Sequence, residues 1–224
     1  MSLHDGHRAR KREQFNTHGL DAFADHEALE LLLFYAIPRR NVNPIAHRLM
    51  ERFGSLDGVF SASLEELTSV EGVGKNAATL IRLLFPLCRR VRTAANGRPT
   101  ILDTTERVGE YFLDVFFGEK TEKLYEACLD AKGKLLGLYC LSEGGADRVS
   151  INMRRAVENA LSSNASAVVL SHNHPSGIAL PSEEDVHTTM QLDAALRAVG
   201  VHLADHVIVA DEDFVSLRQS GVLD

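Results

Sequence analysis

Residues 171–177 read Ser-His-Asn-His-Pro-Ser-Gly, and Ser182 and Asp185 follow shortly after. The apolar run that precedes this stretch is typical of a buried strand. Residues i and i+2 of a strand point to the same side, so the imidazoles of His172 and His174 can face one point at the strand's end. The stretch therefore predicts a strand, a turn and a helix arranged around one site.

Asp185 supplies a third polar group at that point. Ser182 is a favourable N-cap residue, and a helix is predicted from there to about Val199, with Asp185 at its N3 position. Two histidines and one carboxylate, with a fourth position left for water, are the ligand set of a catalytic zinc site. A His-x-His pair alone is common, so the prediction depends on the strand, the turn and the helix N-terminus around it.

The spacing of the two histidines, the serine and the aspartate is similar to the JAMM (MPN+) metalloprotease motif. The His-Asn-His-Pro-Ser-Gly sequence and segments 43–48 and 203–209 resemble the RadC family, and the resemblance covers nearly the whole chain. It implies a zinc-dependent metallohydrolase of peptidase or isopeptidase type, which hydrolyses an amide bond in a peptide or protein substrate. The implied cofactor is Zn²⁺, with His172, His174 and Asp185 as ligands.

The resemblance also implies a general base upstream of the histidines. In JAMM proteins this base is a glutamate at the start of a strand, and residues 122–130 resemble that segment, with Leu124 in place of an aromatic residue. The alignment puts Glu122 in the base position, although a solvated surface charge is the alternative. Glu126 shares a strand face with Glu122, so periodicity alone leaves both open. Position favours Glu122, because Glu126 would lie in the middle of the sheet.

Ser182 has two candidate roles. The JAMM pattern implies a hydrogen bond to the oxyanion that forms at the attacked carbonyl, and one such donor lowers a barrier by about 3 kcal/mol. The alternative is an N-cap alone. Asn173 and Ser176 are interpreted as turn formers. His206 is interpreted as the structural partner of the neighbouring Asp205, with a metal role as the alternative.

The composition is that of a soluble globular protein, with 45% hydrophobic and 25% charged residues. No apolar run approaches about 18 residues, so neither a membrane span nor a membrane partner is expected. The polar beginning of the chain predicts no secretory signal. Cys88, Cys128 and Cys140 are widely spaced and form no CxxC, which predicts reduced thiols and a cytoplasmic location.

Charge divides the chain into two parts. Residues 1–98 hold 14 Lys and Arg against 11 Asp and Glu, whereas residues 99–224 hold 10 against 20. An Asn-Gly-Arg-Pro break occupies residues 96–99. Together these features predict two domains, 1–98 and 99–224, with a boundary near residue 98.

The first domain is predicted to be small and all-helical. Asp25 is expected to cap a helix that runs to Ala36, and Pro44 to begin a helix that ends near Gly54. Residues 63–66 read Ser-Leu-Glu-Glu, a capping box that opens a short helix.

Residues 70–75 read Val-Glu-Gly-Val-Gly-Lys, and a helix is predicted after them over about 76–91. The arrangement resembles a helix-hairpin-helix motif, in which Gly72 and Gly74 would let the backbone approach a nucleic-acid phosphate and Lys75 would add charge. The alternative is a packing or protein-contact unit, and the small excess of basic residues is a weak electrostatic footprint. Weak, non-specific DNA contact is therefore one of two options for this hairpin.

The second domain is predicted to be α/β (α+β), with helices packed on a curved mixed β-sheet, the JAMM/MPN-type fold that the motif implies. Strands are expected near 123–129, 135–141, 167–170, 201–209 and 214–217, and helices near 106–117, 152–162 and 182–199. One stretch departs from the RadC pattern. The family often has Pro-Arg-Glu at the start of the helix before the histidine strand, whereas residues 153–155 are Met-Arg-Arg.

A second function class stays open at this point. The chain could be a DNA-associated accessory protein, in line with the historical link of RadC proteins to DNA repair. The hairpin would then be the working part, and zinc would be structural. The complete ligand spacing favours the enzyme, because inactive relatives of this fold tend to lose ligands.

Overall fold

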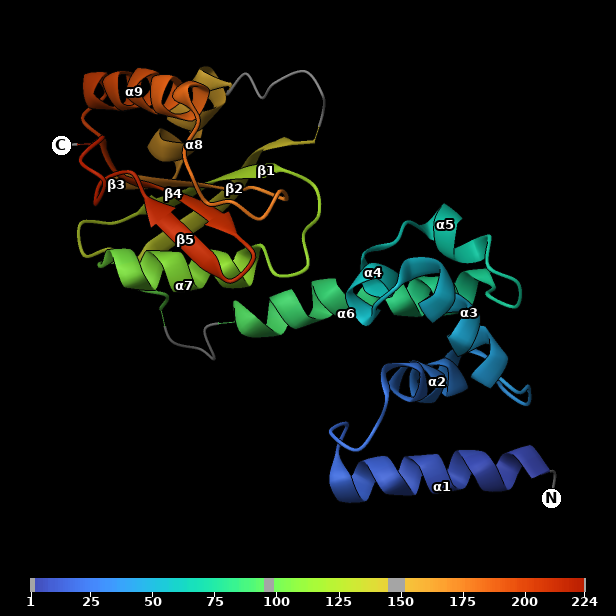
Figure 1. Ribbon diagram of the computed structural model, residues 1–224. Helices are drawn as coiled ribbons and strands as arrows, with labels where there is room; N and C mark the ends of the chain where they lie inside the picture. The colour runs from blue at the N-terminus through green and yellow to red at the C-terminus, as the bar shows by residue number, and fades with distance from the viewer. Residues whose placement is uncertain (1–2, 95–98, 145–151, 224) are drawn as a thin grey trace. The chain divides into compact units, whose positions relative to one another are not determined.

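A computed structural model of the chain describes residues 3–94, 99–144 and 152–223. The chain separates into two compact units, Met1–Cys88 and Arg89–Asp224. The predicted fold class is confirmed, because a helical first part precedes a five-stranded mixed sheet with packed helices (Figure 1). The predicted boundary near residue 98 lies outside the described residues.

The first part of the chain forms six helices among its described residues. They are α1 (Leu3–His18), α2 (Asp25–Ala36), α3 (Asn43–Phe53), α4 (Leu56–Ser61), α5 (Leu64–Thr68) and α6 (Lys75–Arg92). Helix α3 begins at Asn43, one residue before the predicted Pro44, and Gly54 is its C-cap as predicted. The predicted capping box of α5 is confirmed. The prediction for α2 was wrong by one residue. Its N-cap is Ala24, whose backbone N–H donates to the Glu27 side chain, so Asp25 already lies within the helix.

Helix α1 had no counterpart in the predicted elements, and a buried arginine explains why it forms part of this unit. Arg8 is 7% exposed, and its guanidinium donates to the carbonyl oxygens of Phe34 at 3.2 Å, Ile37 at 2.7 Å and Arg40 at 2.6 Å. The carbonyls of Phe34 and Ile37 lie at the end of α2, where backbone acceptors lack helical partners, and that of Arg40 lies in the loop before α3. Arg8 thus supplies hydrogen bonds to backbone carbonyls at the end of α2 and holds α1 against this helix.

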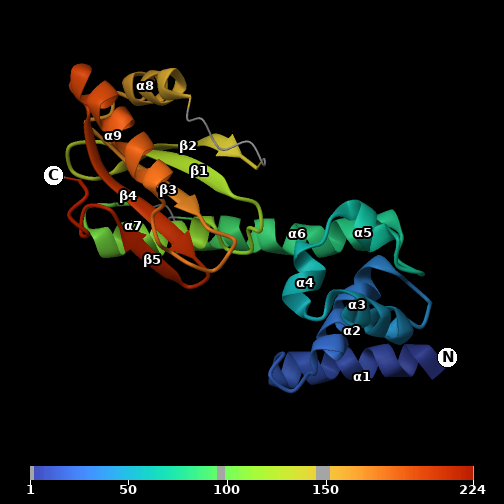
Figure 2. The ribbon, with the colours of Figure 1, turned by 45° about the horizontal axis from the view of Figure 1, so that its top comes forward.

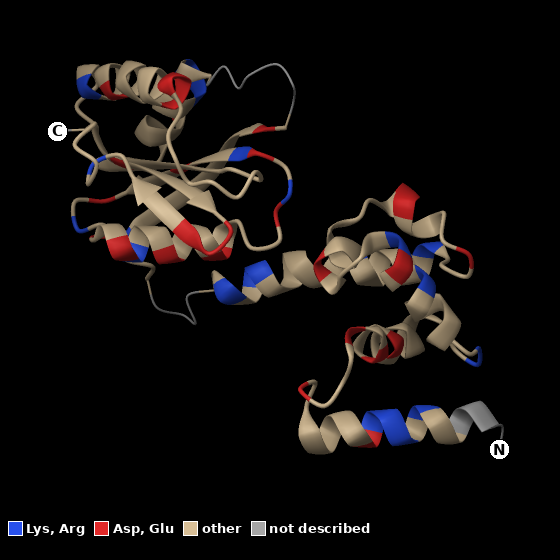
Figure 3. Cartoon of the chain, viewed as in Figure 1, with Lys and Arg blue, Asp and Glu red and all other residues tan. Residues whose placement is uncertain are grey.

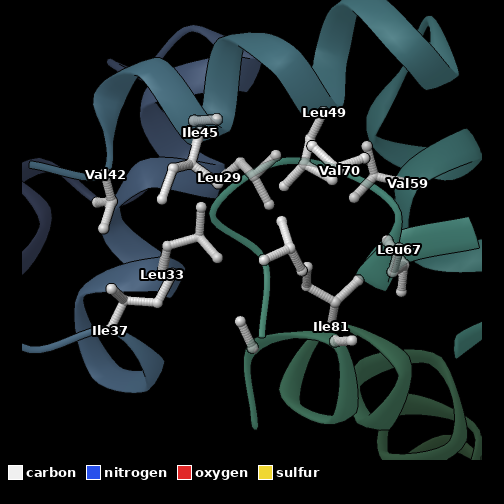
Figure 4. Close-up of a cluster of buried hydrophobic side chains, with 14 of the residues drawn as sticks. Leu29, Leu33, Ile37, Val42, Ile45, Leu49, Val59, Leu67, Val70 and Ile81 are labelled. Atoms are coloured by element: carbon white, nitrogen blue, oxygen red, sulfur yellow. The ribbon is translucent and has the colours of Figure 1, made fainter. Parts of the chain in front are cut away.

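The core of the first unit is aliphatic and is contributed by helices on all sides. Leu29 and Leu33 of α2, Ile45 and Leu49 of α3 and Ile81 of α6 are almost completely buried (Figure 4). Their spacings of four residues place each pair on one helix face. This periodicity is why α2 and α3 could be recognised from the sequence.

The second unit is built on one five-stranded sheet in the order β2-β1-β3-β4-β5. The strands are β1 (Lys123–Leu129), β2 (Leu135–Glu143), β3 (Ala167–Asn173), β4 (His202–Ala210) and β5 (Asp213–Ser216). Strands β3 and β4 are parallel, and the other neighbours are antiparallel. A helix connects the two parallel strands, as a parallel pair requires.

Helices cover both faces of the sheet. Helix α7 (Thr105–Val115) lies on one face, and α8 (Met153–Ser162) and α9 (Glu183–Ala198) lie on the other (Figures 1 and 2). The buried side chains of β3 alternate between the two cores: Leu170 packs on the α8 and α9 side, and Val169 on the α7 side. His172 follows Leu170 by two residues and therefore faces α9.

Charged residues cluster on particular helices of both units. Lys and Arg gather on α1 and near the end of α6, whereas Asp and Glu gather on α7 and at the start of α9 (Figure 3). The acidic first turn of α9 holds Glu183, Glu184 and Asp185. Negative charge is favourable at a helix N-terminus, so these residues stabilise the start of α9 beside the histidine strand.

Candidate metal centre

The histidine pair lies where the sequence predicts it, at the end of β3. His172 is buried within the strand, and His174 follows its last residue. The backbone N–H of His174 donates to the Val209 carbonyl of β4 at 2.8 Å, which continues the parallel pairing past the strand's end. The two Nε2 atoms lie 2.8 Å apart, so both imidazoles face one point.

The orientation of His174 is set by its other ring nitrogen. Nδ1 lies 2.9 Å from the carbonyl oxygen of Ile178, and a carbonyl oxygen can only accept. Nδ1 therefore carries a proton, and in a ring with this single proton Nε2 presents its lone pair to His172. The carbonyl of Ile178, in the segment after β3, thus fixes the orientation of the His174 ring.

Asp185 completes the group from the first turn of α9. Its Oδ1 lies 3.3 Å from Nε2 of His172, and its Oδ2 lies 3.8 Å from Nε2 of His174. As predicted, Ser182 is the N-cap and Asp185 occupies N3. The backbone N–H and the hydroxyl of Ser182 donate to Oδ2 of Asp185 at 2.8 and 2.6 Å, and hydrogen bonds to an acceptor oxygen favour its charged form. The group is a carboxylate at neutral pH.

Glu122 approaches the histidines from the residue before β1. Its carboxylate and the donor nitrogens of His172 and His174 all lie within 4.8 Å of one another. The antiparallel register pairs Leu124 with His172, which brings the start of β1 beside the end of β3. Glu122 is exposed, so water can reach it.

Glu126 lies elsewhere, in the middle of β1. It is completely buried, and its Oε2 accepts a hydrogen bond from Asn159 of α8 at 2.9 Å. Burial raises its pKa to about 7, against the opposing effects of the Asn159 hydrogen bond and the charge of Arg155. Periodicity left Glu122 and Glu126 open, and only Glu122 lies beside the histidines.

Asn173 contributes more than the turn that we predicted for it. It lies inside β3 and is buried, so its interpretation as a turn former was wrong. Its Oδ1 accepts from the backbone N–H of Lys123 at 2.8 Å, and its Nδ2 donates to the carbonyl of Thr121 at 3.1 Å. These bonds fix the backbone of the two residues that flank Glu122. The sequence gives no sign of this contact, because Asn173 lies about 50 residues away along the chain.

A second layer of buried polar groups lies behind His172. Its Nδ1 is 2.8 Å from Nε2 of His206, and Nδ1 of His206 is 2.6 Å from the hydroxyl of Thr189. Burial lowers the pKa of His206 well below its usual value, so its ring is neutral. Asp205 instead accepts from the Ser216 hydroxyl at 2.6 Å. Asp205 also accepts from the backbone N–H of His206 at 2.7 Å, so the predicted structural pair forms through the backbone. The His206 ring does not meet the carboxylate, because successive residues of a strand face opposite sides.

These donors suit a divalent transition metal. Two imidazole nitrogens and a carboxylate are common zinc ligands, and bonds of about 2.0–2.2 Å in a tetrahedral site separate neighbouring donors by about 3.3–3.6 Å. The observed separations of 2.8, 3.3 and 3.8 Å bracket that range. A lone pair directed at a second imidazole is also favourable only when a cation or a proton lies between the rings. The residues therefore fit zinc.

The segment predicted as a hairpin lies between α5 and α6 of the first unit. Helix α5, residues 69–74 and α6 follow one another, and Gly72 has a φ of 93°. A side chain at Gly72 would also meet Cδ1 of Ile45 at 2.8 Å, so glycine is required there for packing as well. Gly74 and Lys75 are exposed at the start of α6. Contact of Gly72, Gly74 and Lys75 with DNA stays a prediction.

Comparison with known families agrees with this arrangement of the chain. A family model described as "RadC-like JAB domain" matches residues 102–222, and one described as "UPF0758 N-terminal" matches residues 6–79. The chain belongs to the RadC-like UPF0758 family. RadC-like JAB domains place the second unit in the JAMM-type metallohydrolase family, whose members typically bind zinc.

Similar RadC-like chains share nearly the full length of this one. A UPF0758 protein of Fusobacterium nucleatum is 33% identical, with 97% of each chain covered. One of Ruegeria pomeroyi is 35% identical over 97% of each, and one of Rhodobacter capsulatus is 34% identical over 95% of this chain and 99% of its own. Their shared name states no activity. Among the described residues of this family member, no helix is long and apolar enough to cross a membrane.

Proposed function

We propose that this chain is a zinc-dependent hydrolase that cleaves an amide bond in a peptide or protein, as a peptidase or isopeptidase. The observation that carries the proposal is the position of Glu122. An exposed carboxylate lies beside two convergent imidazoles, and Asp185 lies 3.3 Å from one of them. A structural zinc site has no need of such a carboxylate, because its ligands are closed around the metal.

His172, His174 and Asp185 would hold the metal. Zinc, when bound, supplies Lewis acidity and lowers the pKa of a bound water to about 7. Glu122 is within reach of that water, so it would accept the proton and deliver it to the leaving amine. Its exposure leaves room for a substrate beside the site.

Ser182 would assist in one of two ways. Its hydroxyl donates to Oδ2 of Asp185 at 2.6 Å and accepts from the Asp185 backbone N–H at 3.1 Å. In this arrangement it orients the aspartate. To stabilise an oxyanion, the hydroxyl must redirect its proton from Asp185 to the substrate, which gives up the hydrogen bond to the carboxylate.

The proposed activity is tested by a Glu122→Gln variant. Glutamine keeps the shape of glutamate but cannot accept the water's proton. We expect zinc content and folding to stay the same, and hydrolysis of peptides from a proteome-derived library to fall by about 10²-fold or more. Glu126→Gln is the matched control, because it makes the same chemical change four residues along the same segment. Equal loss in both variants, or a loss in Glu126→Gln alone, would contradict the proposal.

DNA contact through the hairpin is the second candidate. It is supported by the backbone conformation of Gly72 and by the exposed Lys75 at the N-terminus of α6. Backbone N–H groups at such a helix end can bind phosphate. The two functions involve different units and are tested separately.

A further inference from the structure

Behind the candidate metal centre, His172 and Asp185 are joined by a closed path of buried hydrogen bonds. The path runs from Nδ1 of His172 to His206 and from His206 to Thr189. The Thr189 hydroxyl then donates to the backbone carbonyl of Asp185 at 2.5 Å. Thr189 and His206 are 0% and 2% exposed, so water does not compete for these bonds.

The direction of every proton on this path follows from its last bond. A backbone carbonyl can only accept, so the single proton of Thr189 is committed to Asp185. The Thr189 oxygen must then accept from Nδ1 of His206, which therefore carries a proton. A second proton would put a charge on a ring that is 2% exposed and bonded, among the described residues, to His172 and Thr189, so the ring keeps one proton. Nε2 of His206 is left as an acceptor, and only Nδ1 of His172 can donate to it.

These proton positions also determine the state of Nε2 of His172, the nitrogen that faces the candidate metal site. A neutral imidazole with its proton on Nδ1 has its lone pair on Nε2, the atom that faces His174 and Asp185. Partners on the far side of a ligating histidine fix its tautomer and orientation, and their loss typically costs about 10- to 100-fold in metal affinity.

We infer that Thr189 and His206 are positioning residues of the metal centre, which hold His172 in the tautomer that binds zinc and link it to the helix turn that carries Asp185. The inference rests on the proposed zinc site. It assigns a role to two residues that do not touch the metal themselves. It also explains why a histidine is buried in β4 with no acidic side chain bonded to its ring.

Zinc affinity of the full chain tests the inference. In a competition titration with a chromophoric chelator, His206→Phe and Thr189→Val should each weaken Zn²⁺ binding by about 10-fold or more. His206→Gln should recover part of the affinity, because its amide oxygen can accept from Nδ1 of His172. Ser171→Ala is the control: it removes a buried hydrogen bond to Val207 in the same pair of strands, outside the path. It should lower stability and leave zinc affinity unchanged.

A second measurement needs no variant. Long-range ¹H–¹⁵N spectra of the wild-type protein report the tautomer of each histidine, and His206 should carry its proton on Nδ1, whereas free imidazole side chains prefer Nε2. A proton on Nε2 of His206 would overturn the inference even if His206→Phe failed to fold. Wild-type zinc affinity in both His206→Phe and Thr189→Val would also overturn it. If the wild type bound no zinc, the proposed function, on which this inference rests, would be overturned instead.

Discussion

The side chain of Asn173 accepts a hydrogen bond from the backbone N–H of Lys123, 50 residues earlier in the chain, at 2.8 Å. The same side chain donates a second hydrogen bond to the Thr121 carbonyl, so Asn173 is bonded to the backbone on both sides of Glu122. The residue between the two histidines thus places the candidate base. This relationship makes the histidine strand the support for both the metal ligands and the acid–base group.

Asn173→Ala should therefore separate positioning from metal binding. We expect turnover to fall by about 10- to 100-fold, because small displacements of a catalytic group have effects of that size. The free energy of unfolding should fall by about 1–3 kcal/mol from the lost buried hydrogen bonds. Zinc affinity should stay close to that of the wild type. Steady-state kinetics beside a zinc titration measure both, and unchanged turnover would show that Glu122 holds its place without Asn173.

Substitutions of Ser182 by alanine and by glycine separate its role as an N-cap from its role as a donor to the oxyanion. Ser182→Ala should cost about 1 kcal/mol of stability, whereas Ser182→Gly should cost only a few tenths, because glycine is tolerated at an N-cap. Neither residue can donate to an oxyanion, so both variants should lose about 10²-fold in turnover. Urea unfolding and kinetics together distinguish the roles. Full turnover in Ser182→Gly would leave the serine as an N-cap alone.

The buried carboxyl of Glu126 predicts an unusual dependence of stability on pH. Its folded-state pKa of about 7 lies above the ordinary 4.5, so between these values the folded protein binds more protons than the unfolded chain. The free energy of unfolding should therefore fall as pH rises through this range, by up to about 3 kcal/mol, and fall no further from this group above it.

Glu126→Gln removes this titration and keeps the neutral shape. One carboxyl oxygen of Glu126 has no hydrogen-bond partner among the described residues, which also disfavours the charged form. Urea unfolding at about pH 5 and about pH 8 should show the variant gaining stability relative to the wild type at the higher pH. A difference between the two proteins that is the same at both pH values would contradict the prediction.

The hairpin prediction concerns the full chain and duplex DNA. If Gly72, Gly74 and Lys75 contact phosphate, binding should be weak, independent of DNA sequence and steeply reduced by salt. Lys75→Glu should weaken it further. Lys132→Glu, at the exposed turn between β1 and β2, makes the same charge change as a control. Fluorescence anisotropy at low salt measures both, and equal behaviour of the two variants would leave the hairpin as a packing unit.

The sequence was most informative where the site is local in the chain. His172, His174 and Asp185 lie within one strand, turn and helix, so their spacing alone predicts that they converge. Glu122 lies 50 residues before His172, and only the resemblance to a family connected them. Periodicity left open which of Glu122 and Glu126 lies beside the histidines. The register of β1 and β3 brings Glu122 there, because it pairs Leu124 with His172.

Other parts of the structure depend on partners that no local pattern reveals. Arg8 docks α1 by bonding carbonyls 26 to 32 residues away, and a basic, polar segment gives no apolar periodicity to predict. His206 of β4 bonds to His172 of the neighbouring strand β3 and to Thr189 of α9. One signal was present in the sequence, because adjacent strand residues face opposite sides, and this excludes Asp205 as the partner of its ring.

Metal analysis tests the central claim most directly. The full chain, loaded with Zn²⁺ and dialysed at neutral pH, should retain about one zinc per chain, and the His172→Ala/His174→Ala double variant should retain almost none. Glu122→Gln should retain zinc like the wild type, because it leaves all three ligands in place. Equal zinc in the wild type and the double variant would contradict the assignment of His172, His174 and Asp185 as a metal centre.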